Sequence, residues 1–253
     1  MTMFSTPEDS HIHSLKTLNA LYEYDDFMES IATVVDLGCG TGLDLKWWAT
    51  RTTRDDNPQP LNIKCTGVDL LDELPIARAY PNVTYQQTDF EGSIYPPGNN
   101  KFDILWSHNS FQYAINPVAT LSNWWNIASD GGMLSIAVPQ TTNIHRHQLA
   151  FTQESGCYYH YTIVSLIHML AVTGWDCRHG FFLKNSRDPW LHAVVYKSEH
   201  APMNPRTTTW FDLMEKQLLP ASADQSVYAH GELFQQDLIL PWLDHSLTSF
   251  AQQ

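Results

Sequence analysis

Glycines occupy every second position of a short stretch, at Gly38, Gly40 and Gly42. The apolar run before them, 34–37, is typical of a buried parallel strand, and the spacing after them predicts a helix that reaches about Thr53. Glycine suits such a turn because it tolerates a positive φ angle and lets the backbone approach a ligand closely. A strand, a glycine turn and a helix in this order indicate a nucleotide-binding site.

Carboxylates follow the next two predicted strands. The strand over 63–68 precedes Asp69, at the position where α/β nucleotide sites bind ribose hydroxyls. Asp69 could also merely cap the next helix, but its place after the glycine turn favours a ligand. The strand over 83–88 precedes Asp89 and Phe90, which could accept from an adenine amino group and cover its ring.

The strand predicted over 102–107 is a nearly continuous apolar run, typical of a parallel strand buried on both faces. A polar cluster follows it. Ligands of open α/β sheets bind beyond the carboxyl ends of the strands, so we expect the polar residues at these ends to converge. They are Asp36, Asp69, Asp89 and His108.

Strands and helices alternate from 33 to 138, which predicts a parallel sheet with right-handed crossovers. Asn116 and Pro117 form an N-cap followed by proline at the first helical position. We expect 130–132 to end this helix and a strand to follow over 133–138.

The segment 140–157 is irregular and polar, and could be a lid, a substrate loop or only a solvated loop. The spacing of 163–170 predicts a helix against the core, with Tyr158, Tyr159 and His160 at its N-terminal end. An antiparallel hairpin should then close the edge of the sheet, with strands over 175–184 and 190–197.

Two domain-level expectations complete the fold. Residues 1–198 should form one domain that includes an N-terminal helix over 14–31. Residues 199–253 should form a helical extension packed on the same domain, with helices near 210–218 and 226–240. The extension could be a cap, a lid or a dimer contact.

Composition narrows the function classes. The net charge of −13, without a Lys/Arg cluster, disfavours nucleic acid as a partner. No apolar run is long enough to span a membrane, no secretory leader is apparent, and the cysteines are scattered, so we expect a cytoplasmic protein. His11 and His13 are too few for a closed metal site, so no metal is predicted.

Five blocks in the right order resemble the motifs of class I S-adenosylmethionine-dependent methyltransferases. The resemblance covers about residues 32–198. It implies a three-layer, Rossmann-like α/β fold whose seven-stranded, mostly parallel sheet ends in an antiparallel hairpin. The blocks are VVDLGCGTG (34–42), GVDL (67–70), QTDF (87–90), FDILWSH (102–108) and DGGMLSI (130–136).

The resemblance implies where the methionine part of S-adenosylmethionine would lie. The glycines of the turn 38–42 would let the backbone pass beneath it, and Asp36 would hold that end. Ser107 and His108 would offer backbone carbonyls to its ammonium group.

The resemblance also assigns the adenosine part. Asp69 would bind the ribose hydroxyls and Leu70 would pack on the adenine. Asp89 would accept from the adenine amino group, and Phe90 would lie beside the ring. S-adenosylhomocysteine would be the product.

Transfer of a sulfonium methyl group requires mainly alignment and exclusion of water, because the methyl group is already activated. A base is needed only if the acceptor must lose a proton. His108 is the first candidate because histidine titrates near neutral pH and lies at the edge. Tyr113, Tyr159 and His160 follow, although any one histidine could be structural.

Three alternatives compete with this interpretation. A nicotinamide dehydrogenase should carry GxGxxG, whereas position 43 is Leu. A nucleic-acid amino-methyltransferase should carry Asn/Asp-Pro-Pro-aromatic where this chain has Ser107 to Phe111. A catalytically idle S-adenosylmethionine-binding module remains open. We expect a methyltransferase that acts on a small molecule, as a monomer or homodimer.

Overall fold

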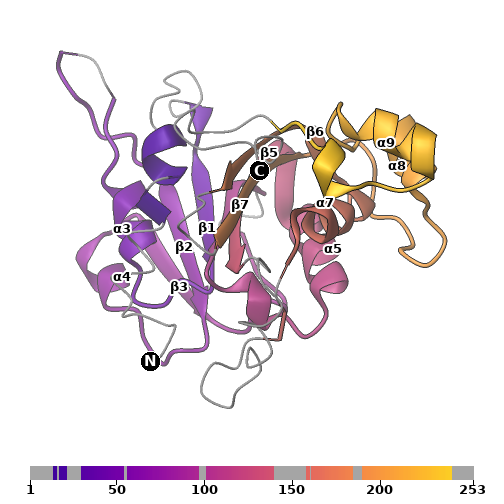
Figure 1. The fold of residues 1–253 in the computed structure, drawn as a ribbon. Helices are drawn as coiled ribbons and strands as arrows, with labels where there is room; N and C mark the ends of the chain where they lie inside the picture. The colour runs from indigo at the N-terminus through magenta and orange to yellow at the C-terminus, as the bar shows by residue number, and fades with distance from the viewer. Residues whose placement is uncertain are drawn as a thin grey trace, which may run out of the picture.

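A seven-stranded sheet forms the centre of the computed structural model (Figure 1). The structure describes residues 14–15, 17–21, 30–53, 56–96, 101–139, 158–159, 161–184 and 190–240. The strand order is β3-β2-β1-β4-β5-β7-β6. Strand β7 is antiparallel to both neighbours, and the other pairs are parallel. The predicted fold class is confirmed. The strands are β1 (Thr33–Leu37), β2 (Lys64–Asp69), β3 (Val83–Gln87), β4 (Phe102–His108), β5 (Ala128–Pro139), β6 (Trp175–Lys184) and β7 (Trp190–Lys197).

Helices cover both faces of the sheet, as Figure 1 shows. On one face, α3 (Leu43–Ala49), α4 (Pro75–Ala79) and the helical residues 17–21 enclose a core that includes Trp48 and Trp106. On the other face lie α5 (Pro117–Ile127) and α7 (Ile163–Val172). All five residues of β1 are buried, because successive side chains supply the two cores in turn.

The start of α5 agrees with the sequence pattern. The Asn116 side chain accepts a hydrogen bond from the N–H of Ala119 at 3.2 Å, and Pro117 occupies the first turn. The predicted N-cap is therefore confirmed.

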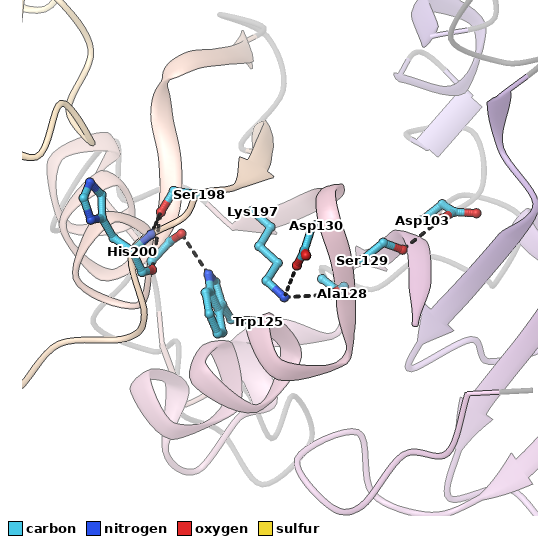
Figure 2. Close-up of polar contacts among 9 residues, drawn as sticks. Asp103, Trp125, Ala128, Ser129, Asp130, Lys197, Ser198 and His200 are labelled. Atoms are coloured by element: carbon cyan, nitrogen blue, oxygen red, sulfur yellow. Dashed lines mark hydrogen bonds and ion pairs between the residues drawn. The ribbon is translucent and has the colours of Figure 1, made fainter. Parts of the chain in front are cut away.

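The junction between α5 and β5 differs from the prediction. The helix ends at Ile127, before the glycine pair, and the strand begins at Ala128. The Lys197 amine donates to the Ala128 carbonyl at 2.9 Å, and Ser129 donates to Asp103 at 2.9 Å (Figure 2). The Lys197 ammonium group on β7 and the Asp103 carboxylate on β4 thus hold this junction in place, where the sequence pattern predicts a glycine cap. Regular pairing nevertheless begins at Met133, opposite Ile104, as expected for the strand.

Several element bounds also need correction. Helix α3 stops at Ala49, and Thr52 pairs instead with Pro60. Helix α4 was not predicted, because five residues are too few to show a helical period. Within the helix predicted over 14–31, residues 14–15, 17–21 and 30 are helical and Ile31 is not; 16 and 22–29 lie outside the described residues.

The C-terminal extension packs on the same core as the sheet. It contains α8 (Trp210–Glu215), α9 (Ala223–His230) and a 3-10 turn, η3 (Gln235–Asp237). Leu213 and Val227 belong to the hydrophobic cluster that holds Leu105. The second predicted helix is thus shorter than 226–240 and begins earlier. Within the part of the chain that the structure describes, no helix is long and apolar enough to cross a membrane.

Candidate active site

The glycine turn after β1 requires glycine for two separate reasons. Gly38, Gly40 and Gly42 have φ angles of +84°, +50° and +81°, which L side chains rarely adopt. A Cβ atom on Gly38 would lie 2.4 Å from the Cβ of Ser110, and one on Gly42 would lie 2.5 Å from Ile76 Cγ2. A Cβ on Gly40 would meet no atom of the described residues within 4 Å, so among these residues this face of the turn is open.

Asp69 joins the turn to the end of β2. Its Oδ2 accepts from the N–H of Gly40 at 2.8 Å, and its Oδ1 accepts from the N–H of Leu70 at 2.8 Å. The N–H groups of Gly38 and Cys39 donate to the carbonyl of Val68 at 2.8 and 3.0 Å. The structure therefore places the Asp69 carboxylate beside the backbone of the glycine turn.

Asp36 makes this region electrostatically receptive to a cation. It is buried at the end of β1, and burial, with the nearby charges of Asp44 and Asp69, raises its pKa well above the usual value. Asp44, on α3, accepts a hydrogen bond from Trp106 Nε1 at 2.8 Å. A positively charged group bound here would favour the ionised form of Asp36.

The residues assigned to adenine line the next part of the edge. Leu70 is 69% exposed, although it is a large apolar residue. Asp89 is exposed, and its Oδ1 accepts from the N–H of Glu91 at 2.9 Å. Phe90 is half-buried and packs edge-on against Trp124, with ring centroids 6.1 Å apart. An apolar side chain, a carboxylate and a fixed ring are thus available beyond β2 and β3.

Ser107 and Ser110 fix the end of β4 beside the turn. Their hydroxyl oxygens lie 2.8 Å apart, and the Ser110 hydroxyl donates to the carbonyl of Leu37. The chain therefore folds over Gly38, where a larger residue would collide with Ser110.

His108 does not have the surroundings of a general base. The ring is buried and stacks on Trp106, with centroids 3.8 Å apart. Its Nδ1 lies 3.1 Å from the hydroxyl of Ser14 and its Nε2 lies 2.9 Å from that of Ser135. Burial, assisted by His192, lowers its pKa well below the usual value. These contacts contradict our first choice of base and give the ring a role in docking the N-terminal helix.

The tyrosine candidates lie beyond β4, against a 3-10 turn, η2 (Phe111–Tyr113). Tyr113 is the half-buried last residue of this turn. The N–H groups of Tyr158 and Tyr159 donate to the carbonyl of Gln112 at 3.0 and 3.2 Å. The Tyr159 hydroxyl donates to the carbonyl of Ile115 at 3.4 Å. Segments distant in the sequence thus meet at this edge. His160, the segment 140–157, His11 and His13 lie outside the described residues.

Two residues of the edge were missed by the sequence analysis. Asn109 has a φ angle of +59°, unusual for a residue other than glycine, and Gln112 is fully buried. Asparagine is enriched in this conformation, so its position after β4 was a usable signal for Asn109. Nothing in the sequence pattern distinguishes Gln112 from an exposed glutamine.

Comparisons with known proteins agree with this geometry. A family model described as a methyltransferase domain matches residues 35–136. A trans-aconitate 2-methyltransferase of Deinococcus radiodurans is 28% identical over 118 residues, which cover 47% of this chain and 42% of that protein. The match thus spans less than half the length of this curated relative.

Solved structures support the fold. One named as an S-adenosylmethionine-dependent methyltransferase from Listeria monocytogenes has a TM-score of 0.52 at 18% identity, covering 72% of this chain and 100% of the other. The StiE O-MT structure has a TM-score of 0.54 at 14% identity, covering 86% of each chain. Residues 35–136 thus match a methyltransferase domain, and the sheet order and the glycine turn agree with the fold of class I S-adenosylmethionine-dependent methyltransferases.

Proposed function

We propose that this chain transfers a methyl group from S-adenosylmethionine to a small-molecule acceptor by in-line displacement. The observation that carries the proposal is the hydrogen bond from the Gly40 N–H to Asp69, which joins the glycine turn to the end of β2 at the carboxyl edge of the sheet. The relative from Deinococcus radiodurans, named for a small acid, supports a small acceptor.

The residues present fit the cofactor. The Gly40 face is open, whereas the Cβ positions at Gly38 and Gly42 are already crowded by protein atoms. Asp36 would hold the methionine part, and backbone carbonyls of Ser107 and His108 would receive its ammonium group. When bound, S-adenosylmethionine supplies an activated sulfonium methyl group.

The adenosine contacts use the residues beyond β2 and β3. Each carboxylate oxygen of Asp69 accepts one backbone N–H, from Gly40 or Leu70, and keeps a further lone pair. These remaining lone pairs would accept hydrogen bonds from the ribose hydroxyls. Exposed Leu70 would cover the adenine, while Asp89 and Phe90 would border its other side.

The protein's part in the transfer is to align the acceptor and to exclude water. The acceptor's lone pair would form the bond to the methyl carbon as the methyl–sulfur bond breaks and S-adenosylhomocysteine leaves. The acceptor's proton, where it has one to lose, would pass to a base or to solvent. Tyr113, Tyr159 and His160 are the proposed candidates for that base. We place His108 behind these candidates, because both nitrogens of its buried ring contact serine hydroxyls.

Calorimetry with S-adenosylmethionine and a methyl-transfer assay over a panel of amine, phenol and carboxylate acceptors test the proposal. We expect saturable binding and transfer to a subset of the panel. An absence of cofactor binding would refute the assignment. Binding without transfer to any acceptor would favour an idle cofactor-binding module, which the names of the relatives do not favour.

A further inference from the structure

Gln112 combines complete burial with an incomplete set of hydrogen bonds. Its side chain has no exposed surface, and its amide Nε2 donates to Asn109 Oδ1 at 2.7 Å. No donor among the described residues reaches its other polar atom, Oε1. A buried acceptor without a partner is unfavourable, because it loses its hydrogen bonds to water and gains none in return, so it calls for a physical explanation.

The position of Gln112 favours a partner on the acceptor side of the site. Ser110 occupies the cofactor side, since it packs against Gly38. Two residues further along the chain, the backbone carbonyl of Gln112 accepts hydrogen bonds from the N–H groups of Tyr158 and Tyr159. The Gln112 backbone therefore lies between the glycine turn and the tyrosines.

Apolar and aromatic side chains that the chain exposes lie beside the Gln112 backbone. Ile115 is 72% exposed, Tyr158 is 53% exposed and Tyr159 is 38% exposed. The hydrogen bond from Tyr159 to the carbonyl of Ile115 keeps these side chains together. Such a surface suits an apolar or aromatic framework with one polar group near its buried end.

We propose that Gln112 determines acceptor specificity by accepting a hydrogen bond from an N–H or O–H group of the acceptor. This inference rests on the proposed function and names its substrate class: amines or hydroxy compounds on an apolar or aromatic framework. A carboxylate brings no donor at neutral pH and would set its charge against the lone pairs of Oε1. Gln112 does not take the proton; it orients the group that carries it.

Asn109 is the second element of this arrangement. Its left-handed conformation directs the chain from β4 into η2, and its side chain holds the Gln112 amide. Non-glycine residues with positive φ angles cluster at functional sites, so the conformation of Asn109 agrees with a role for Gln112 at this edge.

Fragment pairs in which only one member carries an N–H or O–H donor test the inference without a known substrate. With the protein saturated with S-adenosylhomocysteine, the dissociation constants of phenol and anisole, and of aniline and N,N-dimethylaniline, are measured by NMR titration. We expect the donor of each pair to bind about tenfold more tightly to the wild type, as one hydrogen bond allows. Benzoate should bind more weakly than phenol.

Substitutions separate this role from a structural one. Gln112→Met removes the acceptor and should abolish the preference within each pair. Gln112→Glu keeps an acceptor, because Asn109 can turn its amide to donate, and should retain the preference. Gln236→Met, at an exposed position of η3, is the matched control and should behave as the wild type.

Three results would overturn the inference. They are equal binding within each pair by the wild type, a preference that survives in Gln112→Met, and a loss of S-adenosylhomocysteine affinity in Gln112→Met at unchanged melting temperature. The last would assign Gln112 to the cofactor. Failure of the proposed function differs from these, because the wild type would not bind S-adenosylhomocysteine at all, and the role of Gln112 would fall with it.

Discussion

At the scale of single residues, Gly40 and Gly131 have the same backbone constraint but lie at different places in the fold. Both have positive φ angles, +50° and +73°, and an added Cβ would meet nothing within 4 Å at either. Gly40 donates to Asp69 in the candidate site, whereas Gly131 lies at the opposite edge, in the entry to β5. Substitution by alanine should therefore lower the free energy of unfolding by a similar amount at both positions, whereas only the substitution at Gly40 should lower cofactor affinity.

We predict that Gly40→Ala and Gly131→Ala each lower the free energy of unfolding by about 1–2 kcal/mol, the cost of a left-handed L-residue. Only Gly40→Ala should weaken S-adenosylmethionine binding, by about tenfold or more, because its methyl group enters the space proposed for the cofactor. Urea unfolding and calorimetry measure the two effects. Equal cofactor affinity in both variants would show that the Gly40 face is not the binding surface.

At the scale of elements, Glu91 fixes the start of α5 from outside the helix. Its carboxylate accepts from the N–H groups of Ile115 and Asn116 at 2.7 and 3.1 Å and from the hydroxyl of Thr120 at 2.9 Å. Burial alone would raise its pKa, but these three donors together lower it below the ordinary value of 4.5. A negative charge beside a helix N-terminus is also favoured by the helix dipole.

We predict that Glu91→Gln lowers the free energy of unfolding by about 1–2 kcal/mol at pH 7. Because the folded pKa is depressed, the contribution of Glu91 is fully present above pH 4.5 and is lost as the pH falls through the folded value. The two proteins should therefore converge in stability in acid. Glu232→Gln, at an exposed position, is the control and should change stability by less than about 0.5 kcal/mol. A difference that persists unchanged in acid would show that the charge of Glu91 is not responsible.

Helices and strands could be predicted from the sequence where the residues that specify them lie within the element itself. The apolar runs of β1 and β4 and the Asn116-Pro117 start of α5 needed no distant partner. The predicted end of α5 was wrong because Lys197, on β7, donates a hydrogen bond to the carbonyl of Ala128 and so caps the helix. His108 was wrong as a base because the serines that occupy its ring come from two other segments. Partners brought together only by the folded sheet leave no periodic signal in the sequence.

At the scale of the whole molecule, the C-terminal extension is joined to the sheet by packing and by polar contacts. The Cys177 N–H, on β6, donates to the carbonyl of Leu218 at 3.0 Å, and Arg178 pairs with Asp224 at 2.7 Å. Leu218 and Leu219 are buried in the core cluster that also holds β-strand residues. The extension and the sheet should therefore unfold together.

We predict that Leu219→Ala lowers the free energy of unfolding by about 2–5 kcal/mol, as for other buried leucines, within a single cooperative transition. The matched control is Ile239→Ala, because Ile239 also lies in the extension but is 68% exposed; its effect should stay below about 0.5 kcal/mol. Calorimetry combined with amide hydrogen exchange measures both. A separate early transition confined to α8 and α9 would show instead that the extension is an independent unit whose packing contributes little to the stability of the sheet.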